Sequence, residues 1–125
     1  DAVYLVVNAS NTPVDLAWLR EHAHGFEVEI DDQSDATGML ALQGQRSTEV
    51  LQQLVTDCDL TQIGYYKFGF GTVCGLRNTR ISRTGYTGED GFELYHAAGD
   101  AVALAEAILA ARSASVCTKP PPIEK

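Results

Sequence analysis

Residues 80–95 read Arg-Ile-Ser-Arg-Thr-Gly-Tyr-Thr-Gly-Glu-Asp-Gly-Phe-Glu-Leu-Tyr, in which two short runs flank a loop dense in glycine. Residues 80–83 and 92–95 have the length and the side-chain types that are typical of strands. Three glycines within residues 84–91 break any regular pattern between these two runs. The stretch therefore predicts two strands joined by a glycine-rich loop.

Short strands and amphipathic helices continue outward from this stretch. Apolar residues at helical spacing, following capping or first-turn residues, predict helices at residues 13–24, 47–56 and 100–111. Apolar or alternating runs predict strands at residues 3–7, 26–30 and 39–42, and an extended aromatic segment at 65–68.

Three finer expectations concern the second half of the chain. The glycine-rich residues 69–76 are expected to be bent, and Asn78 is expected to sit in a turn. The last helix is expected to share one apolar face among Val102, Ala105, Ile108 and Leu109.

The order of these elements predicts an α+β fold. A βαββα order, followed by a run of strands and a final helix, suggests split βαβ units. We therefore expect a ferredoxin-like sandwich, in which helices cover one face of a mostly antiparallel sheet. Residues 112–125 are proline-rich and lack periodicity, so they are expected to form an irregular tail after a domain of residues 1–111.

Composition narrows the range of partners. The chain has 125 residues, enough for one domain, and a formal net charge of −8. Such an acidic body repels phosphate backbones and anionic lipid, and no apolar run approaches the roughly 20 residues of a membrane span. Three widely spaced cysteines, Cys58, Cys74 and Cys117, argue against a disulfide framework or a structural zinc site. We expect neither nucleic acid nor membrane as a partner, and a reducing, cytoplasmic location.

The glycine-rich loop also contains the strongest candidate for a binding site. Tyr86 offers a flat aromatic face within the loop, and Glu93 offers two acceptor oxygens on the strand that follows. Together they suit a planar heterocycle with adjacent N–H donors, such as a pterin or guanine edge. The alternative is a bulged turn whose glycines are purely structural, and composition alone favours it.

The motifs in this chain resemble those of a known family. Residues 83–93, Arg-Thr-Gly-Tyr-Thr-Gly-Glu-Asp-Gly-Phe-Glu, resemble the signature of the aminomethyltransferases, the T-protein of the glycine cleavage system. Residues 4–10, 40–44 and 65–68 agree with the same family in order and spacing, so the resemblance runs from about residue 1 to about residue 111. Sarcosine and dimethylglycine dehydrogenases carry a related folate module, so the lineage stays open.

The resemblance implies a ligand and a set of contacts. In the family, tetrahydrofolate occupies a central channel, and its N5 accepts a one-carbon unit from the lipoyl arm of the H-protein while ammonia is released. Glu93 would hold the pterin edge, Tyr86 would line the channel and Asn8 would hydrogen-bond the pterin. Tyr66, rather than Tyr65, would contact the folate. The alternatives are an Asx turn for Asn8 and plain packing against the sheet for Tyr66.

The chain also departs from the family pattern. The family's catalytic aspartate precedes the first strand, in a segment that this chain lacks, and Asp1 does not match its context. The family continues past the last helix into a Gly-Leu-Gly-Ala-Arg-Asp segment whose arginine contacts folate. Gln45 stands where the family usually has proline. We therefore expect a folate-binding module truncated at both ends, without aminomethyl transfer by this chain alone.

A non-enzymatic alternative stays open beside this expectation. The chain could be an interaction or regulatory domain that kept the fold, and a sheet face normally covered by missing domains could drive dimerisation. Retention of Asn8, Tyr86 and Glu93 together favours folate binding.

Three other clusters are weaker candidates. His22 and His24 do not share a helical face, and no further ligand lies nearby in the sequence, so metal binding is not expected. Cys74 and His96 lack an orienting third group for a thiol–imidazole pair. Residues 77–83 contain three arginines, Arg77, Arg80 and Arg83. They are either solvated side chains at the edge of a strand or a basic cluster that attracts the folate glutamate tail or an acidic carrier protein.

Overall fold

The computed structural model describes residues 2–115, and the chain divides into two compact units, Asp1–Gln33 and Ser34–Lys125. The N-terminal unit contains a short 3₁₀ turn, η1 (Ala9–Asn11), and one helix, α1 (Thr12–His22). Pro13 occupies the first turn of α1, where its missing N–H costs no hydrogen bond. The helix predicted at residues 13–24 is thus confirmed, with its bounds shifted by one or two residues.

The two strands predicted in the N-terminal unit are wrong. Neither residues 3–7 nor residues 26–30 form a strand, and Val3 and Val28 are 84% and 61% exposed. A strand requires a neighbour that completes its backbone hydrogen bonds. These runs have the apolar or alternating composition of strands, but no described residue forms a ladder with them.

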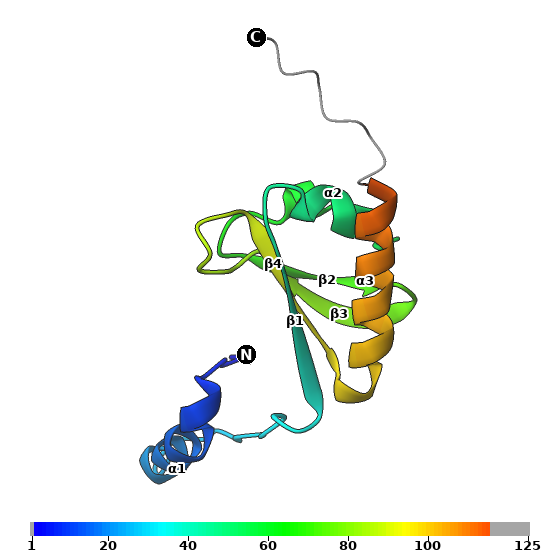
Figure 1. Ribbon diagram of the computed structural model, residues 1–125. Helices are drawn as coiled ribbons and strands as arrows, with labels where there is room; N and C mark the ends of the chain where they lie inside the picture. The colour runs from blue at the N-terminus through cyan, green and yellow to red at the C-terminus, as the bar shows by residue number, and fades with distance from the viewer. Residues whose placement is uncertain (1, 116–125) are drawn as a thin grey trace. The chain divides into compact units, whose positions relative to one another are not determined.

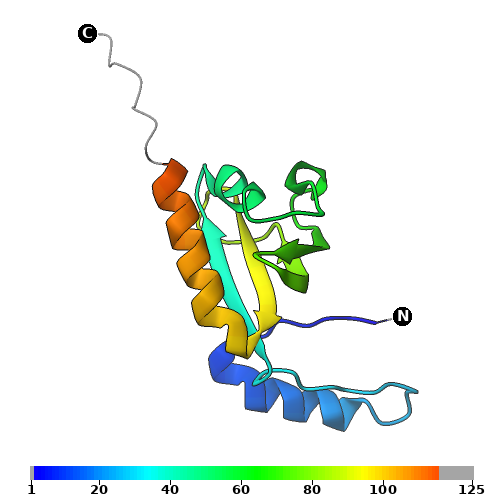
Figure 2. The same cartoon turned by 90° about the vertical axis from the view of Figure 1, so that its right-hand side faces the viewer.

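The second unit is built on a four-stranded antiparallel sheet (Figure 1). Its strands lie in the order β1-β4-β3-β2 and comprise β1 (Thr37–Gln43), β2 (Phe68–Val73), β3 (Leu76–Ser82) and β4 (Gly91–Ala97). Two helices, α2 (Ser47–Gln52) and α3 (Ala101–Ser115), contact each other and β1, and Figure 2 shows α3 running beside that strand. In the sheet, β4 and β3 lie between β1 and β2. Along the chain, α2 lies in the segment that connects β1 to β2. The predicted α+β class, consistent with a ferredoxin-like split βαβ sandwich, is confirmed.

The hydrophobic core lies between the two helices and one face of the sheet. Phe92 and Leu94 of β4 are fully buried and face Leu42 and Leu40 across the β1 ladder. The buried cluster consists of Leu51, Val55, Leu60, Ile63, Val73, Ile81, Phe92, Leu94 and Leu104. Because successive side chains of a strand point to opposite faces, Glu93 projects from the other side of the sheet.

The opposite face of the sheet carries polar and aromatic side chains in register. Glu93 is aligned with Ser82, and Tyr95 is aligned with Arg80. The guanidinium carbon of Arg80 lies 5.8 Å and 5.3 Å from the ring centroids of Phe68 and Phe70, respectively. Both phenylalanines are more than half exposed, so this face differs sharply from the helix-covered core.

The β2–β3 hairpin differs from the prediction of a bent segment. Its turn is Cys74–Gly75, and both residues have positive φ, 52° and 83°. Positive φ at both central residues is the geometry of a type I′ turn, whose twist matches that of paired strands. Asn78 does not lie in a turn but within β3, at φ 58°, where the register with β2 shifts.

Two other local predictions need correction. Residues 65–68 are not wholly extended, because Tyr65 and Tyr66 form a turn before β2 and Tyr66 has φ 57°. In α3, Leu104 is fully buried, whereas Val102 and Leu109 are 70% and 57% exposed. The buried face of the last helix therefore centres on Leu104. Of the predicted set, Ile108 packs against the core, whereas Val102 and Leu109 do not belong to that face.

The last helix is also longer than predicted and ends at Ser115. The proline-rich residues 116–125 lie outside the described residues, so the boundary between residues 1–111 and 112–125 stays a prediction. None of the helices within residues 2–115 combines the length and apolar character that a membrane span requires.

Candidate functional site

The carboxylate of Glu93 is held by two hydroxyl donors. The Thr84 hydroxyl donates to Glu93 Oε2 at 2.5 Å, and the Tyr95 hydroxyl donates to the same oxygen at 3.1 Å. The Thr84 and Ser82 hydroxyl oxygens are 3.0 Å apart, and because the single Thr84 proton goes to Glu93, Ser82 is the donor in that pair. Within residues 2–115, no hydrogen bond reaches Glu93 Oε1. The site therefore presents one oriented acceptor oxygen on the face opposite the helices.

An ion pair closes the glycine-rich loop at residues 84–90. Arg83 donates to both carboxylate oxygens of Asp90, with Nε–Oδ1 and Nη2–Oδ2 distances of 2.9 Å and 2.6 Å. The Arg83 Nη1 group also donates to the carbonyl of Ile63 at 3.0 Å. The hydrogen bonds from Arg83 hold the pKa of the Asp90 carboxyl below its usual range, and Asp90 raises the pKa of Arg83.

Gln43 supports the same loop from the end of β1, a role that the sequence analysis did not predict. Its Nε2 donates to the Thr84 carbonyl at 3.0 Å, across 41 positions of sequence. A Cβ atom at Gly85 or Gly91 would collide with the Gln43 side-chain amide. A side chain at either position would therefore require the Gln43 amide to move away from the loop. The only sequence signal for this role was the place of Gln43 in the motif at residues 40–44.

Both predicted tyrosines are exposed near this loop. Tyr86 is 99% exposed within it, and Tyr66 is 70% exposed. The Tyr66 N–H donates to the Arg83 carbonyl at 3.0 Å, so the turn that carries Tyr66 adjoins the beginning of the loop. The Tyr66 ring meets Tyr65 edge-on, with centroids 4.5 Å apart. The exposure of Tyr66 argues against plain packing on the sheet. Neither the Tyr66 nor the Tyr86 side chain is hydrogen-bonded to Glu93.

Asn8 belongs to the N-terminal unit and is described on its own. It precedes η1, and its carbonyl accepts from the Asn11 N–H at 2.8 Å. Its side chain makes no capping hydrogen bond, so the Asx turn considered from the sequence is not formed.

The three arginines of residues 77–83 do not act as one basic cluster. Arg83 is engaged by Asp90, whereas Arg80 lies beside two phenylalanine rings. Arg77 is exposed at the register shift in β3. Attraction for an anionic group is therefore not a shared property of these side chains.

The histidines and cysteines show no catalytic arrangement in the described part of the chain. The His22 ring stacks on Trp18 at 4.0 Å, and within residues 2–115 no group of three potential metal ligands comes together. Partial burial raises the pKa of the Cys74 thiol, which disfavours the nucleophilic thiolate. His96 is buried, and its Nδ1 lies 2.8 Å from the Ala97 carbonyl oxygen.

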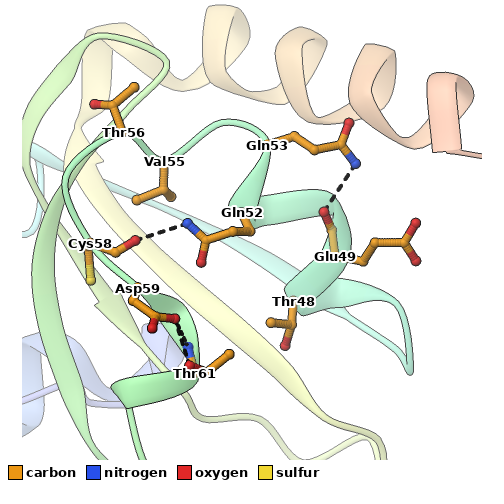
Figure 3. Close-up of a pocket in the computed structure, with 9 residues that line it drawn as sticks. All are labelled: Thr48, Glu49, Gln52, Gln53, Val55, Thr56, Cys58, Asp59 and Thr61. Carbon is orange, nitrogen blue, oxygen red and sulfur yellow. Dashed lines mark hydrogen bonds between the residues drawn. The ribbon is translucent and has the colours of Figure 1, made fainter.

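An open hollow beside α2 is a weaker candidate than the Glu93 face (Figure 3). Several of its polar groups are already hydrogen-bonded to one another: Gln52 Nε2 donates to the Cys58 carbonyl at 3.0 Å, and Asp59 accepts from the Thr61 N–H at 2.9 Å. The hydrogen bonds from Thr61 lower the pKa of Asp59. No residue of the 84–93 stretch lines this hollow.

The Arg83–Asp90 pair leads to a first testable prediction. Replacing Asp90 with asparagine should lower the free energy of unfolding by about 1 kcal/mol, because both partners are still partly exposed and screened. Folding depresses the Asp90 pKa, so this contribution is present above the unfolded value of about 3.9. It should disappear as pH falls below about 4 towards the folded pKa. Urea denaturation at several pH values measures the difference.

The matched control for this experiment is Glu89→Gln, which removes one negative charge from the neighbouring exposed residue. We expect this control to leave stability within about 0.5 kcal/mol of the starting protein. A difference between Asp90→Asn and the starting protein that persists unchanged at pH 2.5 would contradict the ion-pair explanation.

The sequence of this chain matches one protein family over most of its length. The family model described as the GCVT N-terminal domain matches residues 1–118. The aminomethyltransferase of Geobacillus thermodenitrificans is 54% identical over 111 residues, which cover 89% of this chain and 30% of that protein. The aminomethyltransferase of Moorella thermoacetica is 53% identical over 107 residues, covering 86% of this chain and 29% of that protein. The chain thus spans about 30% of the length of these relatives.

A solved structure shares the fold. The chain is similar to heterotetrameric sarcosine oxidase from Corynebacterium sp. U-96, with a TM-score of 0.73 and 17% identity. The match covers 87% of this chain and 54% of that chain. At this identity the likeness shows the fold alone.

Proposed function

The chain belongs to the aminomethyltransferase family through its GCVT N-terminal domain, and from this premise we propose that it is a tetrahydrofolate-binding module. Within a whole aminomethyltransferase, it would provide the wall that recognises the pterin ring. The bound tetrahydrofolate would supply the nitrogen that accepts the one-carbon unit. A lipoyl-bearing carrier, the H-protein of the glycine cleavage system, would be the partner that delivers this unit.

The Glu93 carboxylate is the observation that carries the proposal. Its Oε1 is the acceptor left for a ligand, because the two protein donors both bind Oε2. The pterin edge offers adjacent N–H donors, and a hydrogen bond to a charged group contributes about 1.5–3 kcal/mol. Because Oε1 keeps both of its lone pairs, this single oxygen can accept from the donors of the pterin edge.

Aromatic side chains near Glu93 fit a flat heterocyclic ligand. Tyr86 and Tyr66 are the two predicted contacts, and both present exposed rings next to the loop. Aromatic rings provide large contact areas at a small cost in conformational entropy. Asn8 stays a proposed pterin contact on the resemblance of residues 4–10 to the family motif.

The decisive test compares Glu93→Gln with the starting protein. We expect tetrahydrofolate affinity to fall about 10- to 100-fold, or roughly 1.4–2.8 kcal/mol, because an amide donor would then face a ligand donor. Titration by intrinsic fluorescence, using Trp18 and the tyrosines, measures this affinity. Urea denaturation of the same variant should show little change, because Glu93 lies outside the packed core.

Glu89→Gln is the matched control, since it makes the same chemical change at an exposed position of the same loop. Its affinity should equal that of the starting protein. If the starting protein binds and Glu93→Gln binds equally well, the assignment of Glu93 to the pterin is wrong.

A second candidate function, a non-catalytic interaction domain, is favoured by one observation. Phe68 and Phe70 are 59% and 54% exposed on the same sheet face. A chain that binds no tetrahydrofolate at millimolar concentration, yet forms dimers by analytical ultracentrifugation, would establish this second function in place of the first.

A further inference from the structure

We infer that Thr84 and Tyr95 are positioning residues, which select the Glu93 oxygen that meets the ligand. The inference rests on the proposed function and deepens it, because it concerns how the same carboxylate is prepared for recognition. It assigns no direct ligand contact to either hydroxyl.

The geometry at Glu93 is asymmetric. Two donors converge on Oε2, at 2.5 Å from Thr84 and 3.1 Å from Tyr95, whereas Oε1 receives none from residues 2–115. The terminal torsion of a glutamate is broad in the absence of such contacts. Two hydrogen bonds to one oxygen restrict this torsion and leave the other oxygen as the better acceptor.

The two donors are themselves held by the fold. Tyr95 is only 9% exposed and lies in register between Met39 and Arg80. Thr84 is held through its carbonyl by Gln43 Nε2, and its hydroxyl lies 3.0 Å from that of Ser82. A residue that is already oriented loses less entropy on binding, so these supports increase affinity without touching the ligand.

The two hydrogen bonds to Oε2 determine which oxygen of Glu93 a ligand can contact. Because Oε2 is occupied by protein donors, the strongest new hydrogen bond must form at Oε1. Thr84 and Tyr95 should therefore influence affinity only through Glu93. This dependence separates positioning from a direct contact or from a general structural role.

The test removes each hydroxyl with the least change in shape. Thr84→Val and Tyr95→Phe should each weaken tetrahydrofolate binding about three- to tenfold, the range expected for losing one orienting hydrogen bond. Thr84→Ser keeps the hydroxyl and should bind within about twofold of the starting protein. Thr56→Val, the same change at an exposed residue near α2, is the control and should leave affinity unchanged.

The distinguishing measurement is a double-mutant cycle with Glu93→Gln. In the Glu93→Gln background, Thr84→Val and Tyr95→Phe should change affinity by less than about twofold, since the group through which they act is gone. Circular dichroism and urea unfolding check that each variant is folded. Tyr95→Phe keeps the buried ring, so it provides a second readout if Thr84→Val is unstable.

The outcomes separate this inference from the proposed function. If Glu93→Gln weakens binding but Thr84→Val and Tyr95→Phe do not, positioning is wrong and the pterin assignment stands. Positioning is also wrong if both effects persist at full size in the Glu93→Gln background. If the starting protein does not bind tetrahydrofolate, the proposed function fails and the inference fails with it.

Discussion

Replacing Phe92 with alanine is expected to lower the free energy of unfolding by about 3–5 kcal/mol. The Phe92 side chain is fully buried in the core cluster, so the substitution removes apolar contact and leaves a cavity. Phe92 also adjoins the residues of the site. Gln43 Nε2 lies 3.4 Å from the Phe92 carbonyl oxygen, and the Arg83 guanidinium carbon lies 5.7 Å from the centroid of the Phe92 ring. Urea denaturation followed by circular dichroism measures the loss.

Phe26→Ala provides the matched control for this experiment. Phe26 is 72% exposed, and its removal should change stability by about 0.5 kcal/mol or less. If Phe92→Ala costs less than about 1 kcal/mol, the helix-covered face of β4 is not the core. Because domains are commonly stable by only about 5–15 kcal/mol, a loss of the expected size should also weaken ligand binding measured near the unfolding transition.

This coupling between core and site follows from the alternation of β4. Phe92 and Leu94 face the helices, whereas Glu93 and Tyr95 face the opposite side. A single strand thus anchors the core with one set of residues and presents the carboxylate and one of its donors with the other. Burial of Phe92 and Leu94 therefore fixes the face of the sheet on which Glu93 lies.

The sequence was informative where the structural signal is local. Glycines bounded the loop at residues 84–91, and short runs next to it predicted β3 and β4, at least in part. The runs at residues 3–7 and 26–30 look equally strand-like, but pairing is a long-range property that composition does not contain. The turn at Cys74–Gly75 was missed for a related reason, because Cys-Gly is not among the dipeptides most typical of a type I′ turn.

The same distinction applies to the candidate site. Glu93 and Tyr86 could be selected from the sequence, because a carboxylate and an aromatic residue stand close together in a glycine-rich motif. The role of Gln43 could not, since it contacts Thr84 across 41 positions. Nor could the sequence show that both donors share Oε2 of Glu93. Which oxygen is left for a ligand depends on strand register and side-chain rotamers, and these emerge only from the folded sheet.

Replacing Leu104 with alanine is expected to lower the free energy of unfolding by about 2–5 kcal/mol. Leu104 is fully buried in the core cluster, in the helix that contacts both α2 and β1. Alanine keeps the helix propensity of leucine or improves it, so the expected loss comes from packing rather than from the helix itself. Urea denaturation measures the change, and the helical signal in circular dichroism should persist before the transition.

Leu109→Ala is the matched control, with the same substitution in the same helix. Leu109 lies five positions after Leu104, which corresponds to about 140° around a helix, and it is 57% exposed. Its replacement should therefore cost less than about 1 kcal/mol. Apolar spacing alone placed Leu109 on the buried face, so equal losses at the two positions would favour that prediction over the observed packing. A large loss at Leu104 with a small loss at Leu109 would instead establish that α3 covers the sheet through its Leu104 face, opposite the face that carries Glu93.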